Sequence, residues 1–197
     1  MTSYRNDNTT EYKGYTIAIE YDNNPDSPRD WDNLGTMVCA HRRYNLGDEQ
    51  FDGHYYDGWP LKETLNRKDI LWLPLYLYDH SGITMNTTGF SCPWDSGMVG
   101  FIYITKEKIL KEFGGKILTK KLKDRVYKLL KGEVETYDQY LRGDVYGYII
   151  TDPDGNETDS CWGFYGEEYC LEEAKNVVDW NVNRALQIAI EMPAFMI

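Results

Sequence analysis

Two apolar segments that enclose a polar loop constrain the fold of this chain more than any other feature. The segments are 71–78 and 99–104, and both are short, rich in aromatic and branched side chains, and bounded by Gly or Pro. Such segments are typical of buried strands. The loop between them carries residues from which a site can be built, namely Asp79, His80, Ser81, Cys92, Trp94, Asp95 and Ser96. Because functional residues concentrate on loops that a rigid scaffold positions, this loop is the first candidate for a functional site.

The remaining apolar patterns predict further strands. Alternation of apolar and polar residues, or short apolar runs between turn formers, indicates strands at 12–21, 36–41, 145–151 and 158–165. The last two flank the turn sequence DPDGNE and therefore predict a β-hairpin. Because loops connect neighbouring strands, we expect one mostly antiparallel sheet.

Apolar residues at helical spacing predict the helices that cover this sheet. The segments concerned are 106–113, 117–131, 133–142 and 171–192, and Pro60 could open a further short helix. The buried face of the last helix is expected to consist of Ala174, Val177, Val178, Ala185, Leu186 and Ala189. The sequence thus predicts a disordered tail at 1–11, followed by a single α+β domain at 12–197 in which the sheet packs against two or three helices.

Charge is abundant and unevenly distributed. The chain of 197 residues has a formal net charge of −11, yet residues 106–131 hold 10 basic and 3 acidic side chains. Residues 132–197 hold 3 basic and 14 acidic side chains. The overall balance disfavours direct binding of nucleic acid across a broad face, and it favours either a basic partner or simple solubility.

Cysteine spacing and the lack of long apolar runs restrict the class of protein. The four cysteines show no CxxC spacing, so the sequence predicts no zinc ribbon. The N-terminus lacks the apolar region of a signal peptide, and no apolar stretch is long enough to span a membrane. Phosphate-binding glycine loops are also absent from the sequence. We therefore expect a cytoplasmic protein with reduced thiols, no cofactor and no membrane partner.

The histidines and Cys92 raise the possibility of an enzyme. If the chain is an enzyme, a hydrolase or a nucleotide-modifying protein, its catalytic residues are expected to be His80, Cys92, Asp95 and His54, with Cys92 as nucleophile and a histidine as base. The alternative is that Pro93 and Gly97 shape a tight turn that packs Trp94 inward. Together with His41 the histidines could also bind a metal, but they lack tight HxH or HxxxH spacing, so we expect no metal and assign them to loop backbone contacts.

Arg42 and Arg43 form an adjacent basic pair within an acidic body. They directly follow a predicted strand and precede Asp48. Such a pair could clamp a phosphate or a carboxylate of a partner. Ion pairs with Asp30, Asp32 or Asp48 are the alternative. Because 42–58 and 79–98 both leave predicted strands, we expect these two loops to lie side by side at one edge of the sheet.

Three segments carry a resemblance to known proteins. They are WDNLGTMVCAHRRYNLGD (31–48), LPLYLYDHSGITMNTTGFSCPWDSGMVGFIYIT (73–105) and YLRGDVYGYIITDPDGNETDSCWGFYG (140–166). Together they resemble an uncharacterised family of bacteriophage and mobile-element proteins. The resemblance implies a phage-encoded accessory protein. By analogy, small acidic phage proteins without enzyme motifs often occupy a host defence protein, as anti-CRISPR and antirestriction proteins do.

The sequence therefore favours a binding protein over an enzyme. We expect it to act in the host cytoplasm and to inhibit a host defence protein or ribonucleoprotein with a basic surface, without binding nucleic acid directly. A regulatory or structural phage protein without catalysis is a further alternative. The predicted binding residues are Arg42, Arg43, Asp48, Asp79, His80, Trp94, Asp95, Glu167, Glu168, Glu172 and Glu173. They lie in the two loops and in an acidic surface formed by 133–191.

Overall fold

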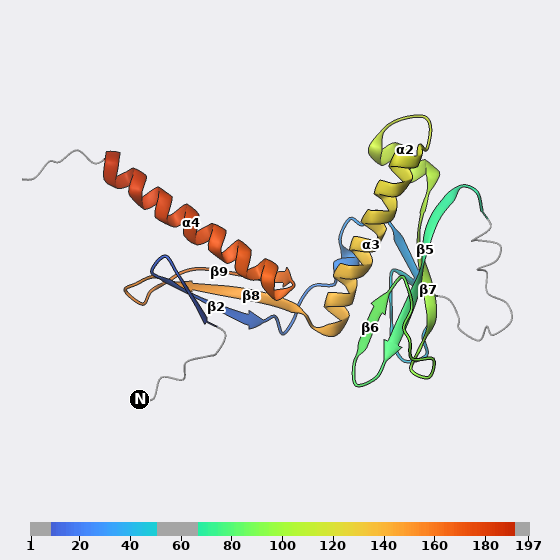
Figure 1. Cartoon of the computed structure of the whole chain (residues 1–197), viewed down its shortest axis with the longest axis horizontal. Coiled ribbons are helices and arrows are strands. Elements are labelled where there is room, and N and C mark those ends of the chain that lie inside the picture. Colours follow the sequence, from blue (N-terminus) through green and yellow to red (C-terminus); the bar gives the residue numbers. More distant parts are fainter. Residues whose placement is uncertain (1–8, 51–66, 192–197) are drawn as a thin grey trace, which may run out of the picture. The chain divides into compact units, whose positions relative to one another are not determined.

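The chain divides into two compact units in the computed structural model, which describes residues 9–50 and 67–191. Unit 1 combines the described residues 9–26 with 143–191, and unit 2 comprises 27–50 and 67–142. Each unit has its own sheet and its own buried core (Figure 1). The α+β class, with helices packed on mostly antiparallel sheets, is confirmed. The expectation of one sheet with one core is wrong, because the N-terminal strands pair with residues far along the chain.

Unit 1 is a four-stranded antiparallel sheet with one long helix on one face. Its elements are β1 (Thr9–Tyr12), β2 (Tyr15–Tyr21), β8 (Val145–Thr151), β9 (Glu157–Tyr165) and α4 (Glu167–Glu191), and the strand order is β1-β2-β8-β9. The predicted strand 12–21 is interrupted at Lys13 and Gly14, whose positive φ angles make a tight turn. Residues 9–11 are therefore in a strand and not in a disordered tail, and residues 1–8 lie outside the described residues.

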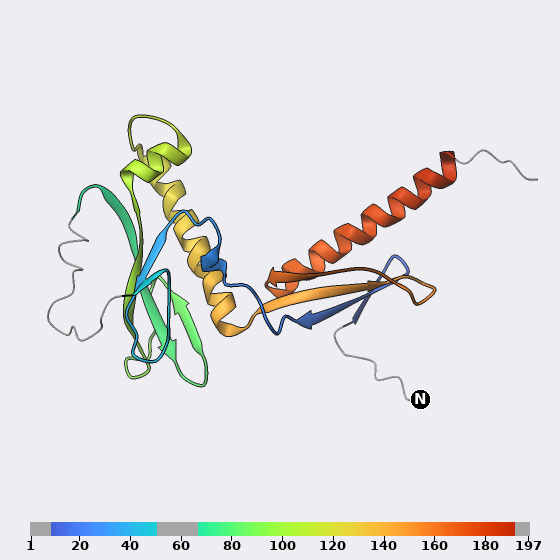
Figure 2. The ribbon, with the colours of Figure 1, turned by 180° about the vertical axis from the view of Figure 1, so that it is seen from behind.

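Helix α4 packs against this sheet only as far as Val182, which is partly buried against the core. Alternate residues of β2 and β8 bury their side chains against the helix, as do Cys170, Ala174 and Val178 on α4. Figures 1 and 2 show the helix diverging from the strands toward its C-terminus. A helix of 25 residues is about 37 Å long, whereas a strand of seven residues spans about 23 Å, so the sheet is too short to cover it.

The predicted buried face of α4 is therefore wrong in its C-terminal half. Ala185 is exposed and Leu186 is 58% exposed, whereas Val178 is the last buried residue among the described side chains of the helix. The side chain of Ala189 lies outside the described residues. A stripe that would be buried in a longer sheet is thus left on the surface of unit 1.

Unit 2 is a five-stranded sheet covered by helices. Its elements are η1 (Pro28–Asp30), β3 (Thr36–Cys39), β4 (Glu49–Gln50), β5 (Ile70–Asp79), β6 (Ile83–Asn86), β7 (Ser96–Thr105), α2 (Lys106–Phe113) and α3 (Lys120–Arg142). The strand order is β4-β3-β7-β5-β6, with every described pair antiparallel except β3 with β4. The central pair β5 and β7 confirms the two apolar segments of the sequence, and β6 is a short strand that the sequence analysis placed in a loop.

The helices of unit 2 follow the predicted apolar stripe. Val126, Leu130, Val134 and Tyr137 of α3 are buried in the core of this unit. The two helical segments expected at 117–131 and 133–142 form one helix that begins at Lys120, so residues 117–119 precede it. A single glycine at 132 does not break a helix that tertiary contacts hold. The short helix expected at Pro60 lies outside the described residues.

Candidate functional site

The described parts of the two predicted loops meet at one end of the sheet in unit 2. Asp79, the last residue of β5, accepts a hydrogen bond from the guanidinium group of Arg43 and forms an ion pair with it. The hydroxyl group of Tyr44 lies 3.3 Å from the other oxygen of Asp79. The predicted proximity of the loops is thus confirmed for 42–50 and 79–98. Residues 51–58, with His54 among them, lie outside the described residues.

His41 completes this first cluster as a neutral side chain. Its ring stacks on Tyr44 with 4.9 Å between the centroids, and its Nδ1 accepts a hydrogen bond from the backbone N–H of Arg43 at 3.3 Å. Burial lowers the pKa of His41, and Arg42 and Arg43 lower it further, against the opposing effect of Asp79. His41 therefore serves to hold the Arg43 backbone.

A second cluster contains the residues that were expected to be catalytic. The thiol of Cys92 lies 3.6 Å from Oδ2 of Asp95, and Nδ1 of His80 lies 3.4 Å from the same oxygen. The backbone N–H of Asp79 donates to the carbonyl oxygen of Asp95 at 2.8 Å, which joins the two clusters. The hydroxyl group of Ser96 donates to the carbonyl oxygen of Cys92. The structure therefore brings His80, Cys92 and Asp95 together.

The order of these three groups differs from what thiol catalysis requires. A histidine that activates a cysteine takes the thiol proton itself, and the carboxylate orients that histidine from the far side. Here the carboxylate of Asp95 lies between the thiol of Cys92 and the imidazole of His80. The side chains of His80 and Asp95 are also open to solvent, so water screens their charges. The contacts are those of a turn held by its own side chains.

Trp94 does not pack beneath this turn. Its side chain is 91% exposed, so the expectation that it packs inward is wrong. Phe90 contacts Tyr78 instead, with 5.6 Å between ring centroids, and covers the strand that leads into the loop. Trp94 is thus available at the surface of unit 2 as a contact residue.

Metal binding has no cluster to support it in the part of the chain that the structure describes. Among residues 9–50 and 67–191, no group of three or more His, Cys, Asp or Glu side chains is placed to hold a metal ion.

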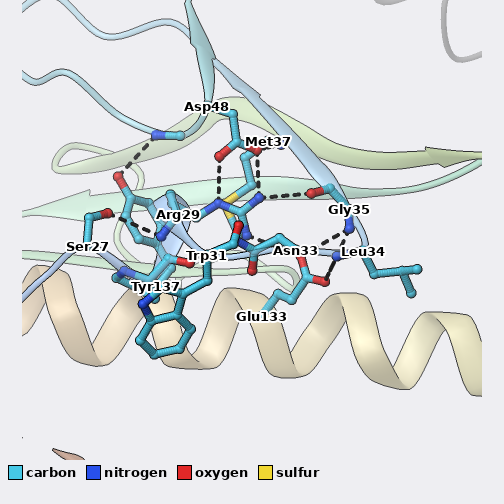
Figure 3. A network of polar contacts seen from close by, with 12 residues as sticks. Ser27, Arg29, Trp31, Asn33, Leu34, Gly35, Met37, Asp48, Glu133 and Tyr137 are labelled. Atoms are coloured by element: carbon cyan, nitrogen blue, oxygen red, sulfur yellow. Dashed lines mark hydrogen bonds and ion pairs between the residues drawn. The ribbon is translucent and has the colours of Figure 1, made fainter. Parts of the chain in front are cut away.

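Asp48, expected as a binding residue or as a partner of the arginine pair, belongs to a different network. Its carboxylate receives two hydrogen bonds from Arg29, at 2.8 Å from Nε and 2.6 Å from a terminal nitrogen (Figure 3). It also accepts the backbone N–H of Met37 at 2.7 Å. The alternative that pairs Asp48 with Arg42 or Arg43 is therefore wrong.

Arg29 is the centre of this network, and the sequence analysis did not select it. Its side chain is only 4% exposed, and it also contacts Glu133 of α3 at 3.1 Å and the carbonyl oxygen of Gly35 at 2.9 Å. Burial alone would lower the pKa of Arg29, but Asp48 and Glu133 outweigh this effect and raise it. Glu133 in turn accepts the backbone N–H of Leu34 at 2.7 Å. The network joins η1, β3 and α3, and its groups are used within the fold.

One signal could have revealed this network from the sequence. Glu133 lies three residues after Leu130 and four before Tyr137, so it falls on the edge of the apolar stripe of α3. A charged residue in such a position needs a partner of opposite charge. Arg29 itself lies in a turn-rich segment whose pattern gives no indication of its partner.

The acidic residues expected to bind a partner lie at the start of α4. Glu167, Glu168 and Glu172 are exposed and Glu173 is partly buried. Over the described residues, unit 1 carries 15 acidic and 3 basic side chains, whereas unit 2 carries 13 acidic and 16 basic ones. The acidic surface was predicted to span 133–191, but Glu133 is committed to Arg29. The excess of negative charge therefore belongs to unit 1.

Comparison with models of protein families, with curated proteins and with solved structures finds no match for this chain. Among the described helices, none combines the length and the apolar character needed to cross a membrane.

Proposed function

We propose that this chain is a binding protein that inhibits a host nucleic-acid-binding defence complex by presenting unit 1 to a basic surface of that complex. The observation that carries the proposal is α4, whose first turns are acidic and whose last turns leave an apolar stripe uncovered. Acidic side chains steer a basic partner toward the helix, and the uncovered apolar side chains supply the short-range contacts.

The uncovered stripe is the unusual feature of this surface. Unit 1 holds seven of the eleven large apolar side chains that are exposed among the described residues, namely Tyr21, Trp162, Tyr169, Trp180, Leu186, Ile188 and Ile190. Ile190 is 83% exposed, close to the end of α4. Five of these seven lie on α4. Exposed apolar side chains that gather on one element are typical of an interface, whereas scattered ones are ordinary.

The field of unit 1 supports association with a basic partner. Fifteen acidic side chains against three basic ones leave a balance of −12 on its described residues. Such a field acts over a Debye length of about 8 Å at physiological salt and mainly raises the association rate. The resemblance of the chain to phage and mobile-element proteins directs the proposal toward a defence complex as the partner.

A phage infection assay tests this proposal. Host cells that carry a restriction or RNA-guided defence are challenged with a targeted phage, and plating efficiency is measured with and without the chain. The chain should restore plating. Reversing Glu167, Glu168, Glu172 and Glu173 to lysine should reduce this effect, and so should replacing Ile188 and Ile190 with serine. Lost contacts worth about 1.4 kcal/mol would weaken the affinity for the partner tenfold.

The matched control replaces Asn181 and Asn183 with serine in the same half of α4. This variant changes polar side chains only and should restore plating as well as the original chain does. If the charge-reversed and the serine variants are folded and retain full activity, the surface of unit 1 is not the binding site. A loss of activity in a His80→Ala, Cys92→Ala variant would then favour an enzyme that uses the loops of unit 2.

A further inference from the structure

The helical end of unit 2 carries a basic face that the proposed function does not use. Residues 106–131, which include α2 and the first half of α3, contain nine lysines and one arginine against three acidic residues. All ten basic side chains are exposed. Lys108 donates to the carbonyl oxygen of Asn33 and Arg125 lies over the ring of Phe113, but none of the ten forms an ion pair with another described residue.

This arrangement opposes the stability of α3 itself. The first turn of α3 contains lysines and no acidic residue, although the N-terminal end of a helix favours negative charge. Lys121 and Arg125 are four residues apart and Lys128 and Lys131 are three apart, so like charges adjoin on the helix surface. Buried Val126 and Leu130 hold the helix in place despite this repulsion.

An ordinary solvated helix face would mix the two signs of charge. The second half of α3 does so, because residues 133–142 carry three acidic side chains and one basic one, and Asp138 pairs with Arg142 at 3.0 Å. The first half, residues 120–131, carries six basic side chains against a single acidic one, Asp124. The unbalanced positive charge is therefore a local property of this end of unit 2, and it fits an external polyanion.

The length of this face and its residue types indicate which kind of polyanion fits it. Residues 120–131 extend about 17 Å along the helix axis. A nucleic-acid duplex carries one phosphate charge per about 1.7 Å of axis with both strands counted, so about ten phosphates lie within this length and those on the side facing the helix are within reach of its lysines. The ammonium group of lysine is a point charge without the fixed fork of donors of arginine, so it suits phosphate contacts better than the reading of base edges. The aromatic residues of this segment, Phe113 and Tyr127, are partly buried and not free to stack on the bases of a single strand.

We propose that the basic face of α2 and α3 binds the phosphate backbone of double-stranded nucleic acid without sequence preference. This inference is independent of the function proposed for unit 1. It also revises the expectation drawn from the whole-chain charge, because that charge averages an acidic unit with a basic one.

Fluorescence anisotropy with the full chain and a labelled 20-base-pair DNA duplex tests the proposal. Affinity should fall as salt rises, and a 20-base-pair duplex of a different sequence should bind equally. Replacing Lys120, Lys121, Lys128 and Lys131 with glutamine removes four phosphate contacts, so the slope of log affinity against log salt should decrease by about 3 to 4. Glutamine is a good helix former and relieves the repulsion, so this variant should fold at least as stably.

The control replaces four exposed basic residues outside this face, namely Arg42, Arg67, Lys68 and Arg184, with glutamine. It has the same net charge as the test variant and should keep the original salt slope. An equal loss in both variants would overturn the proposal, because the attraction would then be non-local. Tighter binding to single-stranded DNA than to duplex would overturn it too. The absence of duplex binding would also overturn the proposal. This holds even if anionic vesicles, or the acidic unit of a second copy, bind the face instead.

Discussion

The long-range ion pairs of the two units differ in burial. In unit 2 the guanidinium group of Arg29 is almost fully buried between Asp48 and Glu133 and fixes the loop from η1 to β3 against α3. In unit 1 the corresponding long-range ion pair, between Lys13 and Asp179, lies at the surface with both side chains partly exposed. Removing one partner of a buried pair leaves an uncompensated charge inside the fold, whereas water screens the charges of an exposed pair.

The buried core of unit 2 is also larger than that of unit 1. Among the described residues, 15 buried side chains form the core of unit 2 and 8 form that of unit 1. Unit 1 also leaves much of its helix uncovered. The comparison indicates that unit 2 has the larger buried core. Unit 1 leaves apolar surface that a partner could cover.

The largest difference is expected when each long-range ion pair is broken. Arg29→Met should destabilise unit 2 by about 3–5 kcal/mol, because Asp48 and Glu133 lose the charge that compensates them. Lys13→Met should have little effect on unit 1, because water screens that pair. Denaturant unfolding followed by hydrogen exchange would assign the loss to a unit. An equal loss from Lys13→Met would contradict the comparison.

The next largest difference is expected in how the stability of each unit responds to alkaline pH. Burial raises the pKa of Cys170 and of Tyr148 to about 12 and also raises that of Tyr146, all in unit 1. In unit 2 burial raises the pKa of Cys39 to about 12 and raises that of Tyr137. Above about pH 9 the unfolded chain loses these protons before the folded chain does, so stability falls by up to about 1.4 kcal/mol per pH unit for each group.

Unit 1 has more of these groups and the smaller core, so it should open first as the pH rises from 9 to 11. Brief proteolysis at several pH values, with mass spectrometry of the fragments, would locate the first cleavages. In a Cys170→Ala variant, the stability of unit 1 should fall less between pH 7 and pH 11, because one group that the unfolded chain deprotonates first is gone. First cleavage within unit 2 would reverse the ranking.

Two glycine substitutions compare the units through smaller losses of stability. A Cβ atom at Gly100 in unit 2 would lie 2.2 Å from the backbone oxygen of Val38 on the neighbouring strand, which cannot move without breaking the pairing. A Cβ atom at Gly147 in unit 1 would lie 2.1 Å from the ring of Trp162, a side chain that is 46% exposed and can rotate away. Gly100→Ala should therefore cost about 1–3 kcal/mol and Gly147→Ala less.

Thermal unfolding would measure both variants. In a Trp162→Ala background, the cost of Gly147→Ala should vanish, because the clashing ring is gone. A persistent cost would indicate that the backbone of β8, and not the ring, restricts this position.

The smallest difference concerns how the helices begin. The hydroxyl group of Thr105 accepts the backbone N–H of Lys108 and caps α2, whereas α4 begins with Glu167 and Glu168 in its first turn. Thr105→Ala should cost about 1 kcal/mol at any salt concentration. Glu168→Gln should cost less, and its cost should decrease as salt rises, because it acts through the helix dipole. Denaturant unfolding at low and high salt distinguishes the two, and a salt-dependent loss from Thr105→Ala would contradict this assignment.

The elements with strong local signals could be predicted from the sequence. The central strands, the hairpin and α2 lie where the patterns placed them, because turn formers, a cap and apolar spacing act over a few residues. The candidate loops could be predicted in the same way, and His80, Cys92 and Asp95 do lie in contact. Their role stays a prediction, since contact alone does not make a thiol reactive.

The tertiary structure decided the rest. Residues 16–21 pair with 146–151, more than 120 positions along the chain, and this pairing creates two sheets where local patterns indicated one. It also decided that Arg29 meets Glu133 across 104 positions, and that the apolar stripe of α4 continues beyond the sheet. An apolar pattern states which side of an element avoids water, but it does not state what covers that side. The covering depends on which distant segments meet, and on how long they are.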